Sequence, residues 1–177
     1  LAVDRDTRPS AVRGCHAGHC LFSGIADHAV AGRLRDGLLS RAMDSGWGIR
    51  TLAEGERRYN PMSYHNGSVW PHDNALIAAG FARYGFRDAA LRIFECMLRA
   101  STHLDLHRLP ELYCGFRRRK GDGPTLYPVA CNPQAWAAGA GFMLLSACLG
   151  LRLDAPRKHL YIHSPRLPRA LDEVRID

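Results

Sequence analysis

The chain has 177 residues, of which 46% are hydrophobic, and a formal net charge of +7. This length and apolar content suffice for one compact domain with a single core. The longest apolar run, residues 133–149, is shorter than the roughly 20 residues of a membrane-spanning helix, so we expect no membrane contact. The basic residues are scattered, and the one dense run, residues 117–120, precedes a Gly- and Pro-containing turn, so we expect no nucleic-acid partner.

The first residues of the chain and the placement of its cysteines bear on the cellular location of the protein. The first residue is Leu, and no stretch near it has the order of charged, apolar and small residues that marks a signal or targeting peptide. Cys96 and Cys148, two of the six cysteines, lie inside apolar helical patterns, where buried thiols are expected rather than disulfides. We therefore predict a cytoplasmic location and a chain that is a fragment of a larger domain.

Residues 1–20 show no sustained period and predict irregular backbone. They include four potential zinc ligands, Cys15, His16, His19 and Cys20. Such compact spacing makes tetrahedral coordination by all four side chains difficult, and no second pair follows at the spacing of a zinc finger. A Cys/His zinc module stays an alternative, but we expect no metal site and no cofactor.

Three amphipathic patterns predict helices in the first two thirds of the chain. Asp27 is suited to cap a helix over residues 28–40. A second helix is predicted over residues 71–84, where Gly85 ends it, and a third over residues 87–101. The short connection at Gly85 predicts that the second and third helices form an antiparallel hairpin.

The last third of the chain predicts one further helix and two short strands. Asn132 and Pro133 open a helix that continues to residue 149 without a charged side chain, so it is expected in the interior. Residues 159–163 and 171–176 have strand-like composition and are separated by a Pro-containing segment. The predicted architecture is therefore mainly helical hairpins, with functional residues on the loops at their ends.

An aromatic loop over residues 59–74 is suited to hold a sugar. Flat apolar rings match the face of a pyranose ring, and short polar side chains match its hydroxyls. The candidate substrate-binding residues are Tyr64, His65, Asn66 and Trp70. The alternative is a rigid aromatic corner between two helices, in which these rings belong to the core and the histidine is a structural donor.

Two carboxylates and one amide are further candidates. Glu111 lies between Pro110 and Leu112, where partial burial is expected to raise its pKa and make it a proton acceptor; the alternative is an exposed or helix-capping residue. Asp73 lies in the first turn of a predicted helix, where we expect it to accept backbone N–H bonds as a cap. Gln134 either points into a cavity or caps the last helix.

Three segments in order resemble the final part of bacterial glycogen debranching, amylo-alpha-1,6-glucosidase-type proteins. They are Tyr-His-Asn-Gly-Ser-Val-Trp-Pro at residues 64–71, Leu-Pro-Glu-Leu at residues 109–112, and Cys131 followed by Gln-Ala-Trp-Ala at residues 134–137. The resemblance spans about residues 10–175, and mannosylglycerate hydrolase-like proteins show looser similarity.

The resemblance implies an all-α fold, a fragment of an (α/α)6 toroid of six helical hairpins with short C-terminal strands. Residues 1–155 would belong to the glycosidase domain, and residues 156–177 would form a tail that packs on it. It implies inverting glycoside hydrolysis of alpha-linked glucans or oligosaccharides, in which Glu111 matches the general base. Tyr64, His65, Trp70 and Gln134 match positions near the sugar pocket.

One departure from the family pattern limits the expected activity. The general acid of these proteins is an Asp in an earlier hairpin, commonly in a Gly-Arg-Asp segment, and this sequence contains no such segment. We therefore expect the chain to be inactive or nearly so without the N-terminal part of the domain, and to expose apolar surfaces where helices are missing. A noncatalytic carbohydrate-binding remnant, or a basic zinc or nucleic-acid module, are the alternatives.

Overall fold

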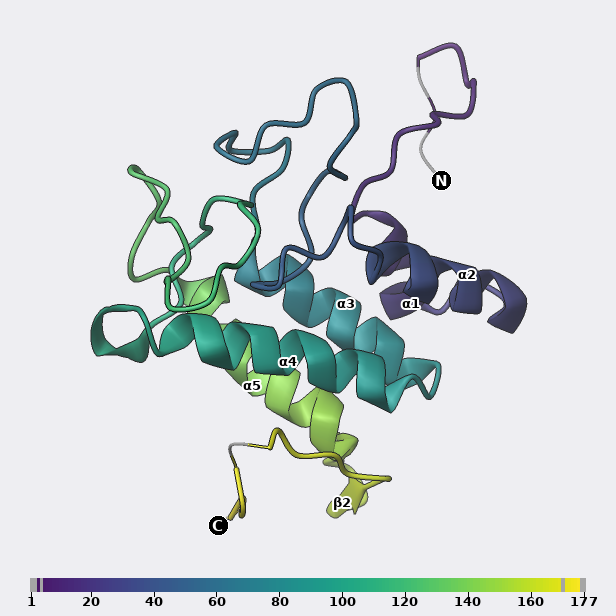
Figure 1. The fold of residues 1–177 in the computed structure, drawn as a ribbon. Helices are drawn as coiled ribbons and strands as arrows, with labels where there is room; N and C mark the ends of the chain where they lie inside the picture. The colour runs from purple at the N-terminus through teal and green to yellow at the C-terminus, as the bar shows by residue number, and fades with distance from the viewer. Residues whose placement is uncertain (1–2, 4, 170, 176–177) are drawn as a thin grey trace.

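A computed structural model describes residues 3, 5–169 and 171–175, and it is mainly helical (Figure 1). The helices are α1 (Ala17–Ser23), α2 (His28–Leu38), α3 (Pro71–Arg83), α4 (Arg87–Ser101), the 3-10 helix η1 (Asp105–His107) and α5 (Ala135–Leu149). Two short strands follow, β1 (Leu151–Asp154) and β2 (His159–Ile162). Among the described residues, none of these helices has the length and apolar character needed to cross a membrane.

The predicted helices α2, α3 and α4 are confirmed to within two residues at each end. Asp27 caps α2 as expected, because its carboxylate accepts a hydrogen bond of 2.7 Å from the backbone N–H of Val30. Gly85, with φ +80°, joins α3 to α4, and the two helices pack against each other as the predicted hairpin. Helix α5 begins at Ala135 rather than Pro133, because Gln134 is still extended.

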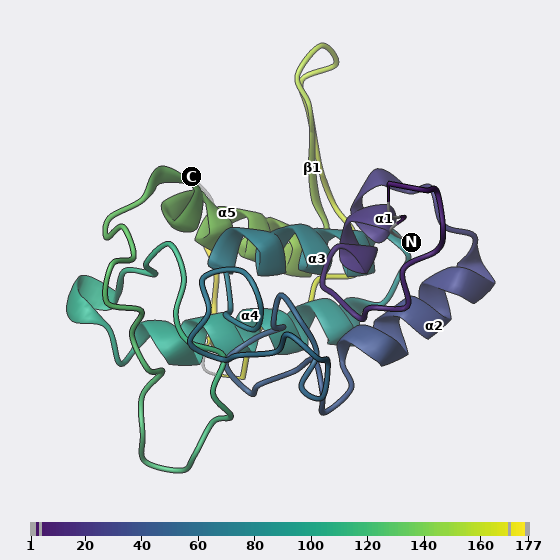
Figure 2. The ribbon, with the colours of Figure 1, turned by 90° about the horizontal axis from the view of Figure 1, so that it is seen from above.

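Helix α3 lies at the centre of the fold, where α1, α4 and α5 all pack against it (Figures 1 and 2). Its side chains Ile77 and Phe81 are fully buried. Gly80 allows close approach, because a Cβ there would lie 2.7 Å from the backbone nitrogen of Phe22 near the end of α1. Helix α1 itself was not predicted, since residues 1–20 were expected to be irregular.

Helices α1 and α5 flank α3 and expose apolar side chains. On α5, Phe142 is 77% exposed and Trp136 is 49% exposed, although Leu144 on the same helix is fully buried. Near the other end of the row, Ile25 is 79% exposed. The prediction that α5 is interior is therefore correct for one face only. Helices α1, α3 and α5 form a row, α4 packs against both α3 and α5, and apolar side chains stay uncovered at both ends of the row.

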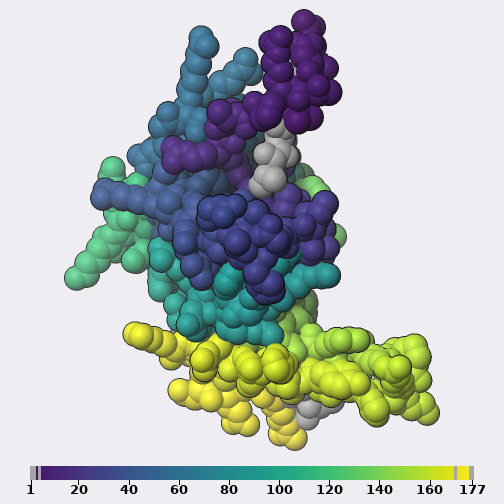
Figure 3. Space-filling model, turned by 90° about the vertical axis from the view of Figure 1, so that its right-hand side faces the viewer, coloured from purple at the N-terminus to yellow at the C-terminus, as the bar shows by residue number. Residues whose placement is uncertain are grey.

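The C-terminal strands form a hairpin that differs from the prediction. Strands β1 and β2 pair antiparallel, with Leu151 opposite Ile162 and Leu153 opposite Leu160. Figure 2 shows this hairpin standing away from the helices, and Figure 3 shows the C-terminal residues as a band along one end of the molecule. The predicted strand at residues 159–163 is confirmed as β2.

The second predicted strand, at residues 171–176, is wrong for residues 171–175, which are not in a strand, and residue 176 lies outside the described residues. Its place as the partner of β2 is taken by β1, because β1 follows α5 directly and the four-residue turn at 155–158 brings β2 back beside it. The domain boundary predicted at residue 155 lies in this turn.

Two long loops lie together over the starting ends of α3 and α5 (Figure 1). Single β-bridges join Arg50 to Val69, Val69 to Tyr113, and Tyr113 to Leu126. Backbones also approach closely at Gly115, where an added Cβ would lie 1.7 Å from the carbonyl oxygen of Gly67. These contacts fix the position of the aromatic loop relative to the segment that carries Glu111.

Candidate active site

A cavity of about 510 Å3 opens between the starts of α1, α3 and α5 and the two long loops. Its lining residues are Cys15, His16, His19, Thr51, Tyr64, His65, Asn66, Trp70, His72, Asp73, Glu111 and Trp136. The structure thus brings together five of the six predicted site residues, namely Tyr64, His65, Asn66, Trp70 and Glu111. Rings and carboxylates converging in one concave space are typical of a ligand-binding site.

Glu111 is a buried carboxylate with both oxygens partnered. Its side chain accepts a hydrogen bond of 2.6 Å from the hydroxyl of Tyr64 and one of 3.1 Å from the backbone N–H of Cys131. The residue is only 5% exposed and lies in no helix, so the alternative of an exposed or helix-capping Glu does not hold. The backbone N–H of Glu111 in turn donates to the Cys131 carbonyl at 2.9 Å, which fixes the main chain there.

The pKa of Glu111 shifts opposite to the expected direction. The Tyr64 hydroxyl, donating to the ionised form, holds the pKa of Glu111 below its usual value, and this effect outweighs the opposing effect of burial. The prediction of a raised pKa was wrong because it counted burial without the two donors. Glu111 is consequently a carboxylate at neutral pH, as a proton acceptor must be.

Tyr64 connects Glu111 to the aromatic cluster. Its hydrogen bond to Glu111 raises the pKa of Tyr64 to about 12, so the hydroxyl keeps its proton. The Tyr64 ring meets the ring of Trp70 edge-on at 4.8 Å and that of Tyr127 at 5.6 Å between centroids. Trp70 is 6% exposed and donates through Nε1 to the Ser68 hydroxyl at 2.9 Å. Trp70 is thus both a core residue and part of the cavity wall.

His72 and Trp136 continue the aromatic wall next to Trp70, whose ring centroid lies 5.6 Å from that of His72 and 6.1 Å from that of Trp136. Their rings stack with centroids 3.9 Å apart and planes 10° apart. Burial lowers the pKa of His72, so its ring is neutral at pH 7. Trp136 belongs to the Gln-Ala-Trp-Ala segment but was not predicted as a site residue. The contact with His72, from a segment more than 60 positions away, is visible only in three dimensions.

Gln134 lies beside the cavity but is not one of its lining residues. It occupies the N-cap position of α5 without a side-chain capping bond, so the capping alternative is not observed. Its side-chain oxygen accepts a hydrogen bond from Nε1 of Trp136. Its amide also contributes to the lowered pKa of Glu111. Gln134 therefore influences the cavity indirectly, through its hydrogen bond with Trp136 and its effect on the pKa of Glu111.

Asp73 does not have the capping role that the sequence predicted. Helix α3 has no side-chain hydrogen bond at its N-cap, and Oδ1 of Asp73 instead contacts Nε2 of His19 at 2.5 Å. The second oxygen, Oδ2, is buried and has no hydrogen-bond partner among the described residues. His19 was considered only as a zinc ligand. The signal that could have found it is the group of polar side chains just before and within α1.

The segment with Cys15, His16, His19 and Cys20 is not arranged as a metal site. Across residues 3, 5–169 and 171–175, no three His, Cys, Asp or Glu side chains are placed to hold a metal ion. Burial, and then the nearby Asp73 carboxylate, raise the pKa of the Cys15 thiol, which therefore stays protonated. The histidines of this segment line the cavity instead.

A model of one known protein family matches most of the chain. The chain matches the mannosylglycerate hydrolase MGH1-like glycoside hydrolase domain over residues 1–116. The chain belongs to this glycoside hydrolase family. No curated protein shows a significant match to it. The expected relation to glycosidases of the six-hairpin type is thus supported at the level of the family.

The region that matches this glycoside hydrolase family contains most of the candidate site. It includes Tyr64, His65, Asn66, Trp70 and Glu111, and it ends before Gln134. The family supports glycosidase chemistry in general, and the fold is consistent with an all-α glycosidase fragment. The role of each site residue stays a prediction.

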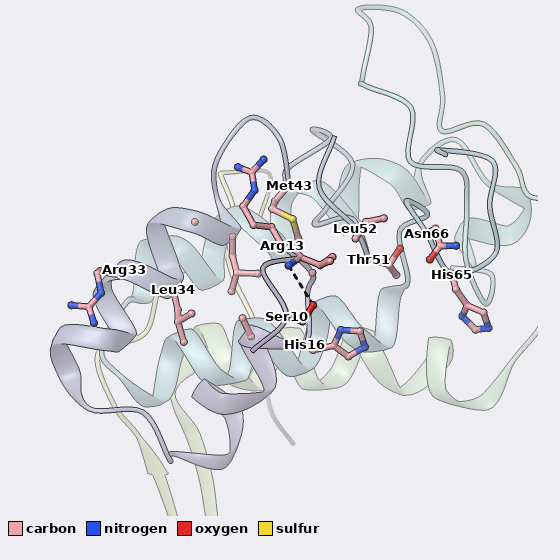
Figure 4. Close-up of a pocket in the computed structure, with 15 residues that line it drawn as sticks. Ser10, Arg13, His16, Arg33, Leu34, Met43, Thr51, Leu52, His65 and Asn66 are labelled. Atoms are coloured by element: carbon pink, nitrogen blue, oxygen red, sulfur yellow. Dashed lines mark hydrogen bonds between the residues drawn. The ribbon is translucent and has the colours of Figure 1, made fainter. Parts of the chain in front are cut away.

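A second cavity, of about 470 Å3, adjoins the first (Figure 4). The two share His16, Thr51, His65 and Asn66. The remaining wall of the second cavity is more apolar and includes Leu34, Leu38, Met43 and Leu52. A ligand that extends past the shared residues would therefore enter this second, more apolar cavity.

Tyr64→Phe is expected to raise the pKa of Glu111, because it removes the hydroxyl that stabilises the ionised carboxylate. The measurement is an NMR titration of the Glu111 side-chain carboxyl in both proteins. Tyr161→Phe, which removes an exposed hydroxyl on β2, is the matched control and should leave this pKa unchanged. An unchanged titration of Glu111 in Tyr64→Phe would show that the hydroxyl does not set its pKa.

Proposed function

We propose that the chain is the C-terminal portion of an inverting glycoside hydrolase of the amylo-alpha-1,6-glucosidase, glycogen-debranching type. Its substrate would be an alpha-linked glucan or oligosaccharide. The observation that carries the proposal is Glu111, a buried carboxylate with a lowered pKa in a cavity walled by aromatic rings. The family match supports glycosidase chemistry in general, and the three sequence segments favour the debranching type.

In this mechanism, Glu111 accepts a proton from a water molecule as the water oxygen bonds to the anomeric carbon. The bond from that carbon to the glycosidic oxygen breaks, and the leaving oxygen takes a proton from a carboxylic acid. The two carboxyl groups of such a pair stand about 6.5–9.5 Å apart, which leaves room for the water. Tyr64 keeps Glu111 oriented and ionised, while His65, Asn66, Trp70 and Gln134 would bind or position the sugar.

The acid would come from an N-terminal part of the same domain, which is the partner we propose. The exposed apolar side chains Trp136 and Phe142 on α5 and Ile25 after α1 are suited to pack against further helices. Packing there would close the row of helices toward a toroid and complete the cavity. All six cysteines are free thiols, which supports the proposed cytoplasmic location.

The test compares two proteins in hydrolysis of maltooligosaccharides and branched dextrin. One is this chain alone, and the other is extended through the upstream genomic sequence. Activity only in the extended protein is the expected result. Turnover by the chain alone would contradict the need for a separate acid and would require a second carboxylate of the cavity, Asp73, to supply the proton.

A noncatalytic carbohydrate-binding protein is the second candidate. It is favoured by one observation, that the only other carboxylate among the cavity-lining residues, Asp73, is already engaged by His19. This candidate predicts sugar binding without turnover in both the short and the extended protein.

A further inference from the structure

His19 has one ring nitrogen bound and one free. Nε2 of His19 lies 2.5 Å from Oδ1 of Asp73, an interaction between residues 54 positions apart that the packing of α1 on α3 makes possible. No hydrogen bond of the second nitrogen, Nδ1, occurs within the described part of the chain. The His19 side chain is 44% exposed and lines the same cavity as Glu111. It is therefore accessible to a ligand in that cavity.

Asp73 determines the protonation and orientation of this ring. Its side chain is 9% exposed, and its carboxylate raises the pKa of His19, chiefly through the hydrogen bond. Other titratable groups around this pair are His16, whose ring centroid lies 6.3 Å from that of His19, His72, which is neutral at pH 7, and the protonated thiol of Cys15 beside Asp73. A protonated His19 has two N–H donors, of which one is held by Asp73 and the other is left for a ligand.

We propose that His19 is a substrate-binding residue of this cavity, that Asp73 positions it, and that its Nδ1 forms a hydrogen bond with a hydroxyl of the bound sugar. The proposal rests on the proposed function and adds a binding residue to it. The buried Asp73 carboxylate already holds the His19 ring in one orientation. Little conformational entropy of the ring is therefore lost when a ligand binds.

A sugar hydroxyl can bond to Nδ1 of His19 in either protonation state of the ring, because a hydroxyl both donates and accepts hydrogen bonds. Glu111 lines the same cavity, so its carboxylate can accept from another hydroxyl of the same ligand.

The test follows the histidine ring signals of this chain by NMR during titration with maltotriose. We expect the His19 signals to shift and saturate, and His19→Gln to weaken maltotriose binding by about 5-fold, as for a lost hydrogen bond. Asp73→Asn should lower the pKa of His19 and also weaken binding. The control is His159→Gln, on the exposed strand β2, which should bind as the unaltered chain does.

Each contrary result has a distinct meaning. Unmoved His19 signals with maltotriose, or a His19→Gln variant that binds as tightly as the unaltered chain, would overturn the proposal. The titration of the unaltered chain decides this even if Asp73→Asn folds poorly. Hydrolysis by the extended protein that survives Glu111→Gln would overturn the proposed base, while weaker binding by His19→Gln would still support His19 as a binding residue.

Discussion

Glu111→Gln is expected to reduce hydrolysis of branched dextrin by the extended protein about 100- to 10,000-fold, the usual effect of removing a general base. The amide keeps the size of the carboxylate but cannot take a proton from water. Because Tyr64 lowers the pKa of Glu111, the unaltered enzyme should keep its base ionised to a lower pH than an ordinary carboxylate would. The acid limb of the pH profile should therefore lie below the usual range for Glu.

The matched control is Glu54→Gln. Glu54 is also a loop carboxylate, but its side chain is 49% exposed, it pairs with Arg117, and it does not line the cavity of Glu111. Initial rates over a range of dextrin concentrations separate turnover from binding, and the loss in Glu111→Gln should appear in kcat. Equal activity of Glu111→Gln and Glu54→Gln would exclude Glu111 as the base.

Arg50→Met is expected to lower the free energy of unfolding by about 3 kcal/mol, because it removes two hydrogen bonds that a buried guanidinium donates to backbone carbonyls. Arg50 is 1% exposed. Its Nε donates to the carbonyl of Gly115 at 2.7 Å, and its Nη1 donates to that of Ala42 at 3.0 Å. Methionine fills similar space and restores neither bond. The segment that ends at Gly115 also carries Glu111, so the same variant should loosen the cavity.

Urea unfolding monitored by circular dichroism measures this effect. Arg157→Met is the control, because Arg157 is 73% exposed and its contact with Asp154, at 3.3 Å, is a surface ion pair worth at most about 1 kcal/mol. If both variants unfolded at the same urea concentration, the Arg50 hydrogen bonds would contribute no more than a surface pair.

The helices that the sequence predicted are determined by signals within each segment, whereas the elements that it missed depend on contacts with other parts of the chain. Helices α2, α3 and α4 were predictable because their apolar periodicity and end signals lie within each segment. Helix α1 was missed because it has seven residues, begins with Ala-Gly-His-Cys, and gains its order from packing on α3. Strand β1 was missed because it follows Gly150 at once and is paired only by residues after the turn.

In the candidate site, too, the features carried by short segments were predictable and those that depend on distant contacts were not. The aromatic loop and Glu111 are marked by residue types within short segments, so the sequence sufficed to single them out. The direction of the Glu111 pKa was not predictable, since it depends on a hydroxyl 47 positions away. The change of Asp73 from an expected cap to a partner of His19 likewise requires two helices to be placed side by side.

The β1–β2 hairpin gives the molecule a projecting arm whose loss should leave the rest in place. Its turn contains the adjacent basic residues Arg157 and Lys158, both exposed, and every residue of β2 is exposed as well. Such a surface turn is a preferred site of nicking by proteases. Brief digestion with trypsin should therefore cut the arm at its tip before any helix, and the same turn is a natural place to insert a fluorescent tag.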